Sequence, residues 1–129
     1  MKNKLQKKLK GITLIELTVV ILVLLSLIAV LFIGARAYKE ASDRTACILT
    51  IRNAQQAGRA WQNLNNIAEG ADVVKADIVG TGKFMEVVPP CRAGGDYDWE
   101  EKVPATGKVF LTCDKAGDLD HKPESTEGW

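Results

Sequence analysis

The sequence predicts an α+β protein in which one long N-terminal helix, membrane-spanning in its first half and amphipathic in its second, carries a small antiparallel β-sheet domain. The first supporting observation is an apolar run at residues 12–33, in which Glu16 is the only formal charge. The second is an apolar stripe with helical spacing that follows this run, with no proline before Pro89. The third is a pair of segments, 96–100 and 108–113, with the two-residue alternation of strands.

Residues 12–33 are long enough to cross a bilayer. At about 1.5 Å per residue, a helix of this length spans roughly 33 Å, which covers the hydrocarbon core of a membrane. The apolar region of a cleaved secretory signal peptide is shorter, normally about 7–15 residues. An ordinary signal anchor explains the length but not Glu16. Because an ionised carboxylate at membrane depth is costly, Glu16 is a candidate functional residue.

The first ten residues contain five lysines and no acid: Lys2, Lys4, Lys7, Lys8 and Lys10. By the positive-inside rule, this end of the chain stays in the cytoplasm and the C-terminal part is exported. The 17 basic residues of the chain include these five, so the remainder has 12 basic against 16 acidic residues, a net charge of −4. Nucleic-acid binding needs a clustered basic surface, so direct contact with nucleic acid is not expected.

The string KGITLIELTVV at residues 10–20 resembles the class III signal of type IV pilins and type II secretion pseudopilins. In that family a prepilin peptidase cuts after the glycine on the cytoplasmic face, and the new amino terminus is usually N-methylated. The resemblance implies cleavage between Gly11 and Ile12, methylation of Ile12, and removal of residues 1–11 as a leader. Phenylalanine is the commonest first mature residue in the family, and Ile12 departs from it.

The resemblance also implies a function that is structural rather than enzymatic. The chain would be a bacterial filament subunit that leaves the inner membrane with the help of an assembly platform and stacks against other pilin-like subunits. In this setting Glu16 would pair with the methylated amine of Ile12 in a neighbouring subunit and assist assembly. Two alternatives remain open: a competence pseudopilin for DNA uptake, and a single-span membrane-anchored binding module that does not polymerise.

Residues 12–34 are predicted to be the transmembrane and filament-core helix, and residues 35–66 its amphipathic continuation. The stripe on the second part favours core packing over a ligand groove. Together with a domain at 67–129, this helix gives the lollipop form of the family. The stripe residues are Tyr38, Ala41, Ile48, Ile51, Ala54, Gly58, Trp61, Leu64 and Ala68.

The C-terminal domain is predicted at residues 67–129. The apolar segment 72–88 fits a short helix or turns, and two prolines end it. Segments 96–100 and 108–113 then form a hairpin packed on the long helix, and the polar stretch 114–129 is a wrapped or loose tail. So few residues cannot bury a large independent core.

Cys91 and Cys113 bracket the hairpin and are predicted to form a disulfide if the domain is exported to an oxidising compartment. Such a bridge would close a loop of about 20 residues and add on the order of 3 kcal/mol. The string PCRAGGDY at 90–97, with the later Cys113, resembles a cysteine pattern of many pilin-like tails. The alternative is a pair of reduced, buried thiols. Cys47, the odd cysteine, is expected to be a buried apolar residue.

The sequence offers little for metal binding or catalysis. Asp114, Asp118 and Asp120 make a weak calcium candidate, since calcium prefers several oxygen ligands, but the spacing matches no EF-hand. No cofactor is otherwise expected. The single histidine, His121, is expected to be a solvated tail residue. The sequence contains no nucleophile motif, no phosphate-binding loop and no Cys-x-x-Cys pair.

Overall fold

The computed structural model describes residue 11 and residues 13–129. The chain divides into two compact units, Met1–Ala37 and Tyr38–Trp129. The predicted leader residues 1–10 and the predicted first mature residue Ile12 lie outside the described part of the chain. Cleavage after Gly11 and methylation of Ile12 therefore stay predictions.

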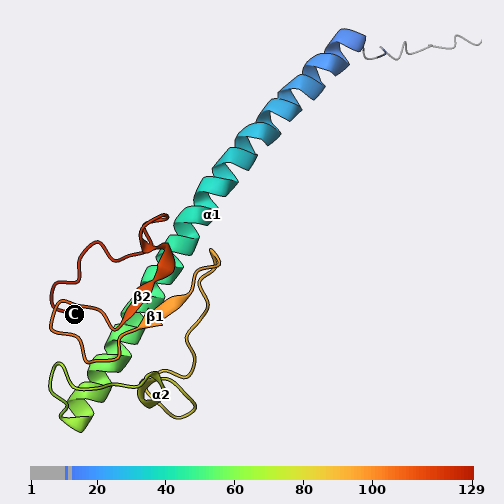
Figure 1. Cartoon of the computed structure of the whole chain (residues 1–129). Coiled ribbons are helices and arrows are strands. Elements are labelled where there is room, and N and C mark those ends of the chain that lie inside the picture. The colour runs from blue at the N-terminus through green and yellow to red at the C-terminus, as the bar shows by residue number, and fades with distance from the viewer. Residues whose placement is uncertain (1–10, 12) are drawn as a thin grey trace, which may run out of the picture. The chain divides into compact units, whose positions relative to one another are not determined.

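Helix α1 runs without interruption from Leu14 to Asn65, 52 residues (Figure 1). The predicted single long helix is confirmed, and its end coincides with the predicted break at the two asparagines. Asn66 has a φ of 51°, and asparagine adopts this left-handed conformation more easily than most residues. The side chain of Asn65 also donates to the carbonyl oxygen of Trp61 at 2.8 Å, within the last turn of the helix.

In the first unit, α1 presents apolar side chains on all sides. Every residue from Leu14 to Ile33 is exposed. The most apolar 18-residue window has a mean hydropathy of 3.1. Within the described residues, α1 is the one helix long and apolar enough to cross a membrane, as the sequence predicts.

In the second unit, strands β1 (Tyr97–Trp99) and β2 (Leu111–Cys113) form the predicted antiparallel hairpin, with Asp98 opposite Thr112. Both strands are shorter than predicted. Backbone bonds continue the pairing at each end, from Glu100 N to the Phe110 oxygen and from Asp114 N to the Asp96 oxygen, each at 3.0 Å. The predicted segments are thus paired over much of their length, although the regular strands cover only their centres.

A short helix, α2 (Lys75–Ile78), lies in the apolar segment 72–88, as expected. Val73 and Ile78 are buried against Phe110 and Val103. Single bridges pair Asp72 with Lys102 and Val79 with Met85. Other apolar residues of the segment, Val74, Phe84 and Val87, lie outside this helix and are exposed.

The core of the second unit packs on the middle of the predicted stripe. Ile51, Ala54 and Gly58 are buried, which supports the core-packing interpretation for this part. Tyr38 and Leu64, near the two ends of the stripe, are exposed because the small domain covers only the central turns. A structural reason for Gly58 also emerges: a Cβ there would lie 2.7 Å from the Phe110 ring.

Candidate functional site

Thr13 and Glu16 exchange hydrogen bonds at the start of α1. The Thr13 backbone N–H donates to Glu16 Oε2 at 3.0 Å, and the Glu16 backbone N–H donates to Thr13 Oγ1 at 3.2 Å. This is a capping box, the reciprocal arrangement that satisfies free N–H groups at a helix start. The spacing Thr-x-x-Glu was readable in the sequence. Glu16 therefore has a role within its own chain, independent of any second subunit.

The second unit brings four chemically reactive side chains together. We call them the thiol–imidazole cluster: Cys47, Cys91, Cys113 and His121. Their potential ligand atoms, three sulfurs and one ring nitrogen, all lie within 4.8 Å of one another, and all four side chains are buried. Cys91 Sγ is 4.0 Å from Cys113 Sγ and 3.5 Å from His121 Nδ1. Among the described residues 13–129, this is the one such group of three or more side chains.

Four separate segments supply the cluster. Cys47 comes from α1, one turn before the core residue Ile51, and is buried as expected. Cys91 follows the proline pair, and Cys113 ends β2. His121 comes from the tail. The three cysteines are free thiols, so the predicted Cys91–Cys113 disulfide is not formed here and stays a prediction, with the two sulfurs in contact.

The prediction of a solvated His121 is wrong: its side chain is only 2% exposed. The preceding residue, Asp120, is fixed to α1 by Arg44. Arg44 Nε donates to the Asp120 carbonyl oxygen at 2.9 Å, and an Arg44 terminal nitrogen pairs with Asp120 Oδ2 at 2.9 Å. Asp120 itself has a left-handed φ of 54°, and this turn sends the next residue inward. A long-range clamp of this kind has no local sequence signal.

Burial controls the chemistry of the thiols. Desolvation raises the pKa of Cys47, and it raises the pKa of Cys113 to about 12. Burial likewise raises the pKa of Tyr97, whose hydroxyl donates to Cys47 Sγ at 3.4 Å. Without a bound cation the thiols of Cys47 and Cys113 therefore favour their neutral form. A metal ion deprotonates a thiol that coordinates it.

The three aspartates proposed as a weak calcium site, Asp114, Asp118 and Asp120, do not converge on one point. Asp114 accepts from the Asp96 backbone N–H at 3.0 Å, and Asp120 pairs with Arg44. Asp118 is exposed. In the described part of the chain these three carboxylates do not form a group close enough to share an ion. The calcium prediction gains no support from this arrangement.

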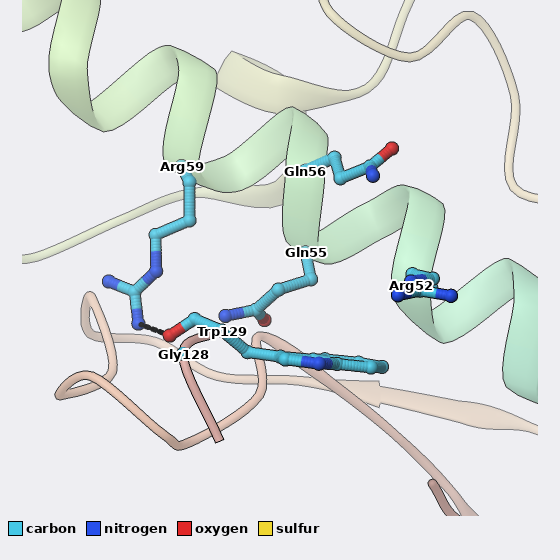
Figure 2. A pocket seen from close by; sticks show the side chains of 6 residues that line it. All are labelled: Arg52, Gln55, Gln56, Arg59, Gly128 and Trp129. Carbon is cyan, nitrogen blue, oxygen red and sulfur yellow. Dashed lines mark hydrogen bonds between the residues drawn. The ribbon is translucent and has the colours of Figure 1, made fainter. Parts of the chain in front are cut away.

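A surface pocket of about 300 Å³ lies beside α1 near Trp129 (Figure 2). Arg59 donates to the main-chain oxygen of Trp129 at 3.3 Å, and the guanidinium carbon of Arg52 lies 5.7 Å from the centre of the Trp129 ring. Gln55, Gln56 and Gly128 complete the lining. Both arginines thus already hold the tail, which favours a packing groove over a ligand site.

No family model, curated protein or solved structure matches the chain. The resemblance to pilins therefore rests on the residues of the N-terminal signal and on the elements described above.

Proposed function

We propose that this chain is a pilin-like structural subunit of a type IV pilus or a type II secretion pseudopilus. The observation that carries the proposal is helix α1. It starts with an acidic first turn at Glu16, continues through a fully exposed apolar segment, and enters the folded second unit without a break. A subunit that must sit in a membrane and later stack through the same segment needs this combination.

The assembly mechanism rests on apolar stacking of the segment 14–33. In a membrane these side chains contact lipid, and in a filament they contact the same segments of neighbouring subunits, which keeps them away from water in both states. Cleavage after Gly11 would create a free amine at Ile12. Glu16 of one subunit and this amine of the next would offset the desolvation of both charges and fix the register between subunits.

The capping box supplies a rival role for Glu16 and favours a second candidate function. If Glu16 serves only to cap α1, the chain is a single-span anchor that presents its exported unit as a binding module and does not polymerise. Glutamine can replace glutamate in a capping box because its side-chain oxygen still accepts the hydrogen bond. Glutamine cannot form the ion pair.

The Glu16→Gln variant therefore separates the two roles of Glu16, capping of α1 and pairing with a neighbouring amine. We expect it to be inserted and cleaved normally but to be absent from sheared filaments, as Glu16→Ala would be. The matched control is Thr13→Val, which removes the reciprocal cap but keeps the charge, and which we expect to assemble. Filament yield from Glu16→Gln equal to that of the wild type would overturn the pairing mechanism.

Processing gives an independent test. In cells that contain the prepilin peptidase, the chain should migrate faster on a denaturing gel than in cells that lack it, because residues 1–11 are removed. The same proposal places the protein in the inner membrane with its N-terminus in the cytoplasm, and afterwards in a periplasmic or surface filament. Mobility that does not depend on the peptidase would favour the membrane-anchored module. A competence pseudopilin would behave as a pilin in both tests.

A further inference from the structure

We propose that the thiol–imidazole cluster binds one Zn²⁺ ion in a closed, structural site of the second unit. This inference goes beyond filament assembly and does not depend on it. Three cysteines and one histidine are a known ligand set for structural zinc, which is four-coordinate and tetrahedral. Soft thiolate ligands with a tetrahedral arrangement select zinc over hard cations such as magnesium and calcium.

The spacing of the ligand atoms fits a tetrahedron around zinc. With Zn–S bonds of about 2.3 Å and a Zn–N bond of about 2.0–2.1 Å, the edges are about 3.8 Å between sulfurs and about 3.6 Å between sulfur and nitrogen. Two of the six corresponding distances here are 4.0 Å for Cys91 Sγ to Cys113 Sγ and 3.5 Å for Cys91 Sγ to His121 Nδ1, and the other pairs lie within 4.8 Å. No large movement of the backbone is needed to bring four ligands to one ion.

The buried imidazole of His121 distinguishes a metal site from a disulfide and from simple packing. A disulfide between Cys91 and Cys113 uses two of the four groups, requires the sulfurs to approach to about 2.0 Å, and gives His121 no role. Simple packing accounts for buried cysteines but not for a polar ring that is 2% exposed, with a nitrogen directed at a sulfur. A role as the fourth ligand accounts for both the burial and the direction of the ring.

The surroundings of the cluster suit a bound metal. The Tyr97 hydroxyl donates to Cys47 Sγ, and hydrogen bonds of this kind orient and stabilise metal-bound thiolates. Binding would release the thiol protons to solvent and leave three thiolates and a neutral imidazole around Zn²⁺, a net charge of −1 for the site. The Arg44 clamp on Asp120 places the histidine before any metal arrives.

A zinc ion here would join α1, the turn at Cys91, the end of β2 and the tail. Besides α1, the second unit has a two-stranded sheet, the short helix α2 and one turn of 3-10 helix at Asp114–Ala116, and so small a core commonly needs an added cross-link. We therefore expect the metal to act in folding and not in catalysis. All four positions around it are filled by protein, which leaves none for a substrate.

The test uses the full chain in detergent, purified without a metal-affinity step and with its thiols protected. Elemental analysis should find one zinc per chain. Zinc content should fall by about tenfold or more in Cys47→Ser and in His121→Gln. The control Thr50→Ser alters a buried residue on the same face of α1 and should retain zinc. Cobalt in place of zinc should give the visible absorption of a tetrahedral ion together with thiolate-to-cobalt charge transfer.

A third variant keeps the test decisive if the first two fail to fold. His121→Cys preserves four ligands, so it should retain zinc and increase the thiolate-to-cobalt charge transfer. Three results would overturn the proposal. The first is equal zinc content in all variants, and the second is no binding of zinc or cobalt by a chain with three free thiols. The third is exported protein whose mass is lower by two hydrogens and whose peptides show Cys91 linked to Cys113. None of these readouts depends on filament formation.

Discussion

Gly58 shows how one small residue sets the distance between α1 and the hairpin. A glycine inside a helix normally costs about 1 kcal/mol relative to alanine. Here the absent side chain allows the Phe110 ring to lie directly on the helix, since a Cβ would approach two ring carbons to 2.7 Å. The guanidinium carbon of Arg59, the next residue of α1, lies 5.3 Å from the centre of the same ring, so the ring also has a cation–π contact with the helix.

We therefore predict that Gly58→Ala destabilises the protein, although helix propensity alone predicts the opposite. Overpacking costs about 1–3 kcal/mol, which outweighs the gain of about 1 kcal/mol from propensity. Thermal unfolding in detergent should show a lower Tm. Gly34→Ala is the matched control, because nothing lies within 4 Å of its Cβ. Adding Phe110→Leu to Gly58→Ala should restore part of the lost Tm. If the double variant recovers none of it, the packing explanation is wrong.

Glu69 supplies a pH-dependent contact at the surface. The Thr106 hydroxyl donates to Glu69 Oε1 at 2.8 Å and the Thr106 N–H donates to the same oxygen at 2.9 Å. These two bonds lower the pKa of Glu69 in the folded chain. The contact therefore stabilises the fold above the pKa that Glu69 has when unfolded, and this contribution is lost as the pH falls through the lower, folded pKa.

Wild type should be more stable than Glu69→Ala at neutral pH, and the difference should shrink as the pH falls below the ordinary pKa of a glutamate and through the lowered pKa of the folded chain. Urea unfolding at a series of pH values measures it. Glu86→Ala, at an exposed position, serves as the control and should show no comparable pH dependence. A difference between wild type and Glu69→Ala that stays constant with pH would exclude the charged hydrogen bonds as its cause.

At the scale of elements, Gln55 joins α1 to the segment that leads into β2. Its Nε2 donates to the Lys108 carbonyl oxygen at 3.1 Å, and its Oε1 accepts from the Phe110 N–H at 2.9 Å. One side-chain amide thus satisfies two main-chain groups just before β2. The side chain is buried, so these bonds are formed away from water.

We predict that Gln55→Leu lowers the free energy of unfolding by about 1–3 kcal/mol, because the buried Phe110 N–H and the partly shielded Lys108 carbonyl would lose their partner. The neighbouring exposed residue gives the control: Gln56→Leu should change stability by less than about 0.5 kcal/mol. Chemical denaturation of the two variants makes the comparison. Equal effects would show that the amide bonds to Lys108 and Phe110 do not contribute to stability.

Elements with a periodic pattern were predictable, and those fixed by long-range contacts were not. The uninterrupted apolar and amphipathic pattern predicts α1 almost to the residue. The alternation around Trp99 and Leu111 predicts the hairpin, but strand length depends on which residues the small domain covers. The capping box is visible in the sequence as Thr13 and Glu16, three residues apart. The position of Glu16 in a membrane-length apolar segment, however, points first to a functional acid.

At the scale of the whole molecule, the thiol–imidazole cluster could not be predicted from spacing. Cys47 and Cys91 lie far apart in the sequence, and His121 comes from a tail that Arg44 helps to fix on α1. Local ligand pairs, which sequence patterns detect, are absent because each ligand comes from a different segment. The sequence indicates only that Cys47 faces the core, because it lies four residues before Ile51 on the face of α1 that the domain covers.

The tail should therefore loosen as a unit when its clamp is removed. We predict that Arg44→Ala makes residues 114–129 more sensitive to limited proteolysis while the hairpin stays protected, because an ion pair and a hydrogen bond to Asp120 are lost. Mass spectrometry of the fragments locates the cuts. Lys39→Ala, an exposed position earlier in α1, is the control. Cleavage spread evenly over the second unit would contradict a local release.

Three sulfurs within reach of one another also have a consequence for the timing of maturation. Oxidation can join any two of them, and the third thiol then lies beside the new bond and can exchange with it. An exported chain that meets oxidant first would become a mixture of cross-linked isomers. A chain that meets zinc first would have all its sulfurs occupied and a single product. The order of these two encounters would then decide how uniform the population of subunits is.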